Sequence, residues 1–398
     1  MDNTALNIAN ENRVKSGVKR LTLTDFRNYD FLRIYAELAP IVITGENGSG
    51  KTNILEAISY LAPGRGLRSS RLTDVKRLGS EDIVNGTAWA VNAVVSCDGE
   101  ESEIGTAVEK SYREDDEVRS SFDRRIVKID GLKIPSQAEL GKYISMVWLT
   151  PQMDRLFRGG AQPRRSFLDR LVYAFDLEHA KRSSSFEQMY REWTHLLRIG
   201  SNDKNWLFSL EDNMASLGVA IAAARREQIA KLNKFIEKEP DDVFPNVVLE
   251  LDGMIEKLLD EKPAVDVEDF YRNYLFSQRK SVAFNENGVD GVNKTDFKVL
   301  HRQKNMPAEL CSTGEQKSLL ISIILAQTKC QTLDKGFAPV LLLDEITAHL
   351  DDLKREALLE KIVGLNVQAW ITSTDEGLFG SLKNEAQFIK VDNGCINK

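Results

Sequence analysis

Three short motifs, widely separated in this chain of 398 residues, combine residue types that hold and cleave phosphates. The first is Gly45-Glu-Asn-Gly-Ser-Gly-Lys-Thr52, and the second is Ser312-Thr-Gly-Glu-Gln316. The third is the acidic pair Asp344-Glu345, which follows the apolar run 340–343. Their order along the chain predicts one composite site for a nucleotide and a metal ion, assembled from distant segments.

The glycine-rich motif predicts a phosphate-binding loop. Its glycines allow the backbone to turn sharply, so that successive N–H groups and the start of the next helix surround an anion. Lys51 is then expected to reach the β- and γ-phosphates of ATP, and the hydroxyl of Thr52 to bind Mg²⁺. The residues predicted to contact the nucleotide are Gly45, Glu46, Asn47, Gly48, Ser49, Gly50, Lys51, Thr52 and Asn53.

The acidic pair predicts metal binding and proton transfer. An unbroken apolar run is typical of a buried parallel strand, and Asp344 at its end is placed to hold the Mg²⁺ shell. Glu345, on the opposite side of the strand end, is predicted to be the general base that activates the attacking water. The predicted catalytic residues are thus Glu345 and Lys51, unless the pair is only a surface feature after a core strand.

The Ser-Thr-Gly-Glu-Gln motif has two explanations. It is a capping box, in which Ser312 caps a helix and Glu315 reaches back to it. It also resembles the signature motif of ABC-type ATPases, which contacts the nucleotide held by a second subunit. Gly314 favours the second explanation, because glycine weakens the first turn of a helix. An ATP-dependent homodimer is therefore expected, with this trans signature formed by Ser312, Thr313, Gly314, Glu315 and Gln316.

Two further segments resemble parts of ABC-type heads. Gln152, after the expected strand 146–150, resembles the glutamine that senses Mg²⁺, with a turn residue as the alternative explanation. Thr374 and Asp375 stand where ABC transporters carry a switch histidine. Sensing of the γ-phosphate in this chain must therefore use another chemistry.

Composition indicates an acidic globular protein and is neutral about a local basic groove. The net charge is −7, with 42% hydrophobic and 28% charged residues. The longest apolar run is too short to span a membrane, and the four cysteines form no Cys-x-x-Cys pair, which favours a reducing cytoplasm. Arg65, Arg68 and Arg71 lie close behind the loop and are predicted to bind DNA phosphates, with solvated surface charge as the alternative. A second basic cluster, which includes Arg164 and Arg165, is open to the same two explanations.

The periodicity predicts an α/β fold: an ABC-type P-loop ATPase head, with a mixed parallel sheet and an antiparallel β lobe, and an inserted helical arm. Strands are expected at 19–25, 41–44, 88–95, 104–108 and 126–134, and a helix about 38 Å long at 210–235. We expect a flexible extension over 1–17 and the N-terminal part of the head over 18–155. The helical arm then covers 156–285, and the C-terminal part of the head 286–398.

Taken together, the motifs resemble those of the RecF family of bacterial recombination mediator ATPases, short relatives of the SMC proteins. The segments that carry the resemblance are Phe26-Arg-Asn-Tyr29, 45–57, 64–68, 163–169, 311–317 and 341–351. The resemblance implies a slow, DNA-stimulated ATPase that dimerises on ATP and recognises double-stranded DNA and single-strand/double-strand junctions. It also implies loading of RecA through RecR and RecO in DNA repair and the SOS response. By the same resemblance, Arg27 and Asn28 help to hold the nucleotide.

The resemblance has departures, and other functions stay open. Residues 291–296 replace a stretch that contains His and Arg in the family, and Gln152 stands where many relatives have an acid. A P-loop small-molecule kinase is an alternative, although it has no use for a trans signature. A nucleotide-gated binding module without significant turnover is another, because a sequence does not give a rate.

Overall fold

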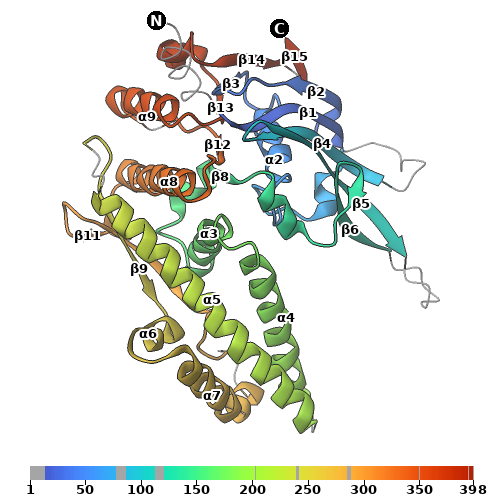
Figure 1. Cartoon of the computed structure of the whole chain (residues 1–398), viewed down its shortest axis with the longest axis vertical. Helices are drawn as coiled ribbons and strands as arrows, with labels where there is room; N and C mark the ends of the chain where they lie inside the picture. The colour runs from blue at the N-terminus through green and yellow to red at the C-terminus, as the bar shows by residue number, and fades with distance from the viewer. Residues whose placement is uncertain are drawn as a thin grey trace, which may run out of the picture. The chain divides into compact units, whose positions relative to one another are not determined.

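The computed structural model describes residues 14–77, 87–112, 121–201, 203–238, 242–284, 288–348, 350–392 and 394–397. The chain forms two compact units, Met1–Met153 with Gln327–Lys398, and Asp154–Ala326 (Figure 1). Most of the expected N-terminal extension lies outside the described residues, and the first strand begins at Ser16. The four-part division expected from the sequence stays a prediction.

The first unit contains a mostly parallel sheet in the order β15-β14-β3-β13-β12-β8. Its central strands are fully buried, as expected for strands covered on both faces. Every neighbouring pair is parallel except β14 with β15. Because parallel strands end at one edge, the segments that follow β3, β13 and β12 meet there. The strands are β3 Ile41–Thr44, β8 Met146–Leu149, β12 Val340–Leu343, β13 Ala369–Ser373, β14 Gln387–Asp392 and β15 Cys395–Asn397.

The same unit contains an antiparallel sheet in the order β2-β1-β4-β5-β6-β7. Leu21, Leu23 and Val91 on one face are fully buried, while the other face carries exposed side chains. The predicted turn is present, with Asp130 and Gly131 both at positive φ, as in the tight turns of hairpins. The strands are β1 Ser16–Phe26, β2 Tyr29–Tyr35, β4 Thr87–Cys97, β5 Glu100–Tyr112, β6 Ser121–Ile129 and β7 Leu132–Lys133.

The helices of the first unit flank these sheets. Helix α2 directly follows the phosphate-binding loop, and α9 lies between β12 and β13 in the chain. The helices are α2 Lys51–Ser59, η1 Leu72–Val75, η2 Gln137–Lys142, η3 Pro151–Arg155, α9 Asp352–Gly364 and η5 Glu376–Leu382. The boundary between the units falls at each end of the second unit, after η3 has begun and within α8.

The second unit is built around a helical core in which α4, α5 and α7 pack side by side (Figure 1). Trp193, Met214, Ile255, Tyr271 and Leu275 are buried in this core. Helix α5 has 35 residues and extends beyond the predicted range 210–235 at both ends, to Lys204 and Lys238. The helices are α3 Ala161–Tyr173, α4 His179–Arg198, α5 Lys204–Lys238, α6 Met254–Glu261, α7 Ala264–Phe284, η4 Ala308–Leu310 and α8 Thr313–Lys335.

A small sheet in the order β11-β10-β9 completes the second unit. Strand β9 (Val247–Asp252) pairs antiparallel with β10 (Asp296–His301), which in turn pairs with β11 (Met306–Pro307). Strand β9 was not predicted from the sequence, because it lies within the expected helical arm. The partner strand β10 begins 44 residues after the end of β9, beyond α6 and α7. The sequence near β9 therefore gives no indication of this pairing.

Candidate nucleotide-binding site

The loop between β3 and α2 requires glycine at two positions because its backbone lies against the rest of the chain. Gly45 and Gly50 have φ values of 152° and 114°, which side-chain-bearing residues rarely adopt. A Cβ atom at Gly45 would lie 2.1 Å from the carbonyl oxygen of Val391, and one at Gly50 would lie 2.4 Å from the Tyr29 hydroxyl. The predicted loop is therefore formed, with α2 starting at its end.

The ammonium group of Lys51 lies over this loop. Its Nζ donates hydrogen bonds of 2.8 Å to the carbonyl oxygens of both Gly45 and Glu46. Burial lowers the pKa of Lys51, while the carboxylates of Glu345 and Asp344 raise it. These two hydrogen bonds hold the ammonium group at the loop. A phosphate bound in the loop would replace the carbonyl oxygens with stronger acceptors.

Thr52 and Asp344, 292 residues apart in sequence, are in direct contact. The Thr52 hydroxyl donates to Asp344 Oδ1 at 2.9 Å. The sheet order explains this proximity, because β3 and β12 both flank β13. In the described part of the chain, no cluster of three or more His, Cys, Asp and Glu side chains could hold a metal alone. Mg²⁺ usually takes one or two carboxylates together with phosphate oxygens and water, so the hydroxyl–carboxylate pair fits that ion.

Glu345 follows Asp344 with a left-handed backbone. Its φ is 49°, a conformation that costs energy in a non-glycine residue and recurs at functional sites. Its N–H donates to the hydroxyl of Thr372 at 2.9 Å, and that hydroxyl donates to Asp344 Oδ1 at 2.7 Å. Thr372 is fully buried near the end of β13. This one hydroxyl therefore orients both acidic residues.

Thr372 was missed by the sequence analysis, which examined its neighbours Thr374 and Asp375. Both neighbours are exposed, and Asp375 caps the short helix η5 by accepting from the Gly377 N–H at 2.8 Å. The signal that could have identified Thr372 is its polar type directly after the apolar residues 369–371 of β13. Gln152 is also exposed, at the start of η3, so the described structure does not bring its amide into the hydrogen-bonded group around Asp344.

Asn28 lies beside the loop and Arg27 beside α2, while their role in holding the nucleotide stays a prediction. Asn28 donates to the carbonyl oxygen of Ser49 at 3.3 Å and accepts from Asn53 at 2.8 Å. Arg27 forms two hydrogen bonds, of 2.6 and 2.9 Å, with Glu56. Burial lowers the pKa of Arg27, but the hydrogen bond and charge of Glu56 raise it, and the net shift is upward. Glu56, fully buried in α2, was not identified from the sequence.

The arginines predicted to bind DNA are all exposed, but they differ in how firmly they are held. Arg68 donates to Asn53 Oδ1 at 2.9 Å and to Glu56 Oε2 at 3.1 Å. It therefore joins the network around Arg27 and Asn28. Arg65 and Arg71 are exposed in the loops on either side of it. Arg68 thus links the basic surface to the nucleotide loop through Asn53.

The Ser-Thr-Gly-Glu-Gln motif forms the predicted capping box in the second unit. The Ser312 N–H donates to Glu315 Oε2 at 2.8 Å, and the Glu315 N–H donates to the Ser312 hydroxyl at 3.3 Å. Lys304 forms an ion pair with Glu315, and this contact with the Ser312 hydrogen bonds lowers the pKa of Glu315 to about 2. Ser312 and Thr313 are exposed, while Gln316 is buried and donates to the Cys311 carbonyl. The trans role stays a prediction.

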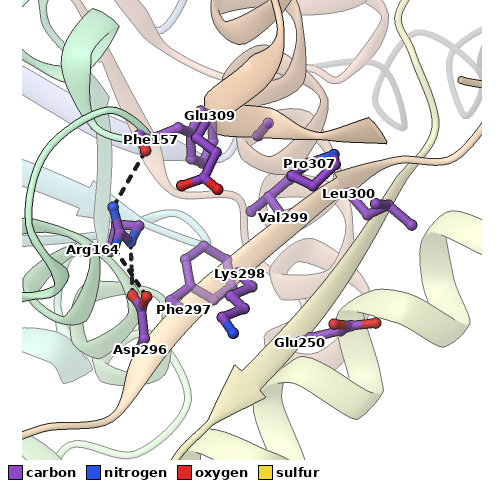
Figure 2. Close-up of a pocket in the computed structure, with 11 residues that line it drawn as sticks. Phe157, Arg164, Glu250, Asp296, Phe297, Lys298, Val299, Leu300, Pro307 and Glu309 are labelled. Carbon is purple, nitrogen blue, oxygen red and sulfur yellow. Dashed lines mark hydrogen bonds and ion pairs between the residues drawn. The ribbon is translucent and has the colours of Figure 1, made fainter. Parts of the chain in front are cut away.

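The second basic cluster braces the second unit internally. Figure 2 shows Arg164 between Asp296 and the carbonyl of Phe157. Its guanidinium donates to both Asp296 oxygens, at 2.7 and 2.9 Å, and Arg165 donates to the carbonyl of Thr295 at 3.0 Å. The adjacent cavity of about 220 Å³ is lined by Glu250 and Glu309 as well. These contacts favour the structural explanation of Arg164 and Arg165 over phosphate binding.

Comparison with known proteins supports the fold and the family. A family model described as RecF/RecN/SMC N terminal domain matches residues 17–397. The DNA replication and repair protein RecF of Agrobacterium fabrum is 43% identical over 383 residues, which are 96% of this chain and 98% of that protein. The protein of the same name from Mesorhizobium japonicum is 43% identical over 382 residues, 95% of this chain and 97% of its own.

Solved structures resemble the whole chain. The recombination mediator protein RecF-ATPrS in the RecFOR pathway matches with a TM-score of 0.77 and 21% identity, over 97% of this chain and 99% of that one. An Smc head bound to the C-winged helix domain of ScpA matches with a TM-score of 0.50 and 17% identity, over 96% of both chains. The predicted fold, an ABC-type head with an inserted helical arm, is confirmed. No helix in the described ranges is long and apolar enough to cross a membrane. By the family model and by these relatives, the chain belongs to the RecF family of DNA replication and repair proteins.

Proposed function

We propose that this protein is an ATP-dependent, DNA-binding recombination mediator with slow, DNA-stimulated ATPase activity. The observation that carries the proposal is the 2.9 Å contact between Thr52 and Asp344, because it joins the phosphate loop and the acidic strand end into one site. Family membership supports ATP as the nucleotide, since a related structure is described as RecF-ATP.

The proposed chemistry assigns a role to each side chain at the site. Lys51 neutralises phosphate charge, and Thr52 and Asp344 hold Mg²⁺, with Gln152 as a further candidate. Mg²⁺ itself would supply charge neutralisation at the phosphates. Glu345 accepts the proton of the attacking water, a role worth ~10²–10⁴-fold in rate. Asn28 and Asn53 hold the loop from the side, through the carbonyl of Ser49.

We further propose that ATP joins two copies of the chain. The exposed hydroxyls of Ser312 and Thr313, at the N-terminus of the 23-residue helix α8, support this assignment. A helix N-terminus favours a bound anion, and the γ-phosphate of ATP held by a second subunit would be such an anion. Gly314 supports it too, because a Cβ there would have nothing within 4 Å, so no contact within the chain requires glycine.

The proposed biological role is recognition of gapped and junction DNA, and the loading of RecA with RecR and RecO, in repair, replication restart and the SOS response. Family membership supports the repair role, and the exposed Arg65 and Arg71 support contact with DNA phosphates. None of the four cysteines, which all lie in the described ranges, forms a disulfide bond, and this supports action in a reducing cytoplasm.

Single-turnover hydrolysis with and without gapped DNA tests the proposal. We expect phosphate release from ATP that accelerates with gapped DNA, together with a shift from monomer to dimer in sedimentation. Dimerisation without phosphate release would identify a nucleotide-gated binding module instead. Phosphate transfer to a small molecule, with neither dimer nor DNA effect, would identify a kinase.

A further inference from the structure

One face of the antiparallel sheet has exposed side chains near both edges and half-buried side chains in its middle. On the edge strand β2, Phe31 and Tyr35 are 58% and 68% exposed, and Arg33 lies between them on the same face. The Arg33 guanidinium lies 5.4 Å from the centre of the Phe31 ring. We call this the open face; its opposite face is buried. Large aromatic rings exposed in a row on a sheet mark a contact surface rather than a core.

The strand register defines a continuous row of side chains across the open face. Its members, from one edge to the other, are Arg33, Thr22, Asn92, Gly105, Lys128 and Lys133. Six strands about 4.8 Å apart make this row about 24 Å wide. The row has cations at both ends, small or uncharged residues in its middle and no carboxylate. A positive stripe of this kind is unexpected in a chain of net charge −7.

The acids of the open face are mostly paired with cations of the same face. Glu103 forms an ion pair with Arg20 at 3.1 Å, and Glu101 forms one with Lys19. Glu109 stands opposite Arg124 in the strand register. These pairs leave Arg33, Lys128 and Lys133 as the cations that set the charge of the central row. The charge of the row therefore complements a polyanion.

The middle of the row contains a glycine, Gly105, inside a strand, and this is a second observation independent of the charge. Glycine inside a strand costs stability and often marks a place where a ligand approaches closely. Its φ is not positive, and a Cβ there would meet only Asn92 Nδ2, at an ordinary 3.7 Å. The fold therefore does not need glycine at this position. The neighbouring row is small as well, since Thr24 is followed by Ala90 and Ala107.

We propose that the open face binds single-stranded DNA, with bases stacked on Phe31 and Tyr35 and phosphates held by Arg33, Lys128 and Lys133. Aromatic rings and cations arranged along a groove or sheet are how proteins hold single strands, because every base has a face that can stack. Bases in a duplex already stack on each other, so the rings favour the unpaired strand. This inference rests on the proposed DNA-binding function and adds a separate surface for the single-stranded arm of a junction.

The test measures binding of a labelled oligo(dT), about 15 nucleotides long, by fluorescence anisotropy. Phe31→Ala and Tyr35→Ala should each weaken binding about tenfold, because a stacked base contributes that order of affinity. Binding of an abasic oligomer with the same phosphates should not change. Phe276→Ala is the matched control, because its ring is 59% exposed and has Arg279 4.6 Å from its centre, but it lies on α7.

Two further variants separate stacking from charge. Gly105→Val should leave thermal stability unchanged or higher, since valine suits a strand, yet weaken oligo(dT) binding. Arg33→Ala should reduce the salt slope of log K by about 0.7, and Phe31→Ala should leave that slope unchanged. Unchanged oligo(dT) affinity in both the Phe31→Ala/Tyr35→Ala and Gly105→Val variants would overturn the proposal. Failure of the wild type to bind any DNA would instead overturn the proposed function.

Discussion

The hydroxyl of Thr372 donates to Asp344 Oδ1 at 2.7 Å from the adjacent strand of the sheet. The hydroxyl oxygen of Thr372 also accepts a hydrogen bond from the N–H of Glu345, so this hydroxyl acts as both donor and acceptor at the site. The residue expected to hold the metal and the residue expected to activate water are thereby fixed to one buried side chain. Thr372 is a positioning residue in this arrangement, since it acts through its two neighbours.

Replacement of Thr372 by valine keeps its shape and removes both hydrogen bonds. A hydrogen bond to a charged group contributes ~1.5–3 kcal/mol, so we expect ATP hydrolysis to fall about tenfold or more. The Mg²⁺ concentration needed for half-maximal nucleotide binding should also rise, because Asp344 loses one of its two hydroxyl donors. Thr372→Ser is the matched control and should restore both values. Equal Mg²⁺ titrations for Thr372→Val and wild type would contradict the positioning role.

Substitutions of the two acidic residues should impair different steps, hydrolysis for Glu345 and nucleotide binding for Asp344. Glu345→Gln preserves shape but cannot accept a proton, so we expect ATP binding to persist and hydrolysis to fall by ~10²-fold or more. Asp344→Asn should instead weaken Mg²⁺-nucleotide binding, because it removes the carboxylate that faces Thr52. Equilibrium nucleotide binding and single-turnover hydrolysis measure the two effects. Hydrolysis at the wild-type rate in Glu345→Gln would rule out Glu345 as the base.

The parts of the fold that sequence predicted well are those with local signals. A few consecutive residues are enough to predict each of three features: the alternation in β1 and β4, the Asp130-Gly131 turn and the glycine loop. Strand β9 alternates too, with Val247 and Leu249 buried, but six residues inside a helical region were a weak signal without knowledge of β10. Long-range pairing decided its state.

The site residues, too, divide into those that a short motif predicts and those whose role depends on distant segments of the chain. The motifs predicted that Thr52 and Asp344 act together, and the sheet order then brings them into contact. The polar type of Thr372 is only a weak local signal, and its role, like that of Glu56, depends on which strand or arginine lies beside it. Arg68 was predicted as a DNA contact, whereas its bond to Asn53 appears only when the loop and α2 are folded together.

A buried ion pair should dominate the stability of the second unit. Asp169 on α3 accepts two hydrogen bonds from Arg225 on α5, at 2.8 and 3.0 Å, and one from His179 at 2.8 Å. Asp169→Asn removes the charge from both of these hydrogen-bonded contacts and leaves the buried Arg225 with only Glu256, 3.6 Å away, as a charged partner among the described residues, so we expect a loss of up to ~3–5 kcal/mol in the free energy of unfolding. Urea denaturation measures it. Asp260→Asn, in an exposed pair with Arg226, is the control and should cost less than ~1 kcal/mol.

The same pair gives a pH dependence with a defined sign. Burial alone would raise the pKa of Asp169, but Arg225 and His179 have a larger, opposite effect, and the pKa is lowered to about 2. Because the folded-state pKa is depressed, the stabilisation is fully present above the unfolded value, near 4, and is lost as the pH falls towards 2. The difference in unfolding free energy between wild type and Asp169→Asn should therefore shrink over that window. A difference that stays constant from pH 5 to pH 2.5 would contradict this account.

The basic surface behind the loop should show two kinds of arginine. Arg65→Ala with Arg71→Ala should lower the salt slope of duplex binding by about 0.9 for each lost phosphate contact and leave ATP binding unchanged. Arg68→Ala should weaken ATP binding as well, because it removes a hydrogen bond to Asn53 beside the loop. DNA titrations at several salt concentrations, paired with nucleotide binding, separate the two. A salt slope unaltered by all three changes would exclude this surface from DNA binding.

The trans signature can be tested at Gly314 without disturbing the capping box. Since a Cβ there has nothing within 4 Å in its own chain, Gly314→Leu should fit the monomer and even favour α8, because leucine has a higher helix propensity by up to ~1 kcal/mol. The added side chain should still block the second subunit, so ATP-dependent dimerisation should be lost in sedimentation while monomer nucleotide binding persists. Ser312→Arg should do the same, but it also removes the cap; Ser312→Ala is its control, since it removes the cap without adding bulk. A wild-type dimer in Gly314→Leu would leave Ser312 and Glu315 with only their capping role.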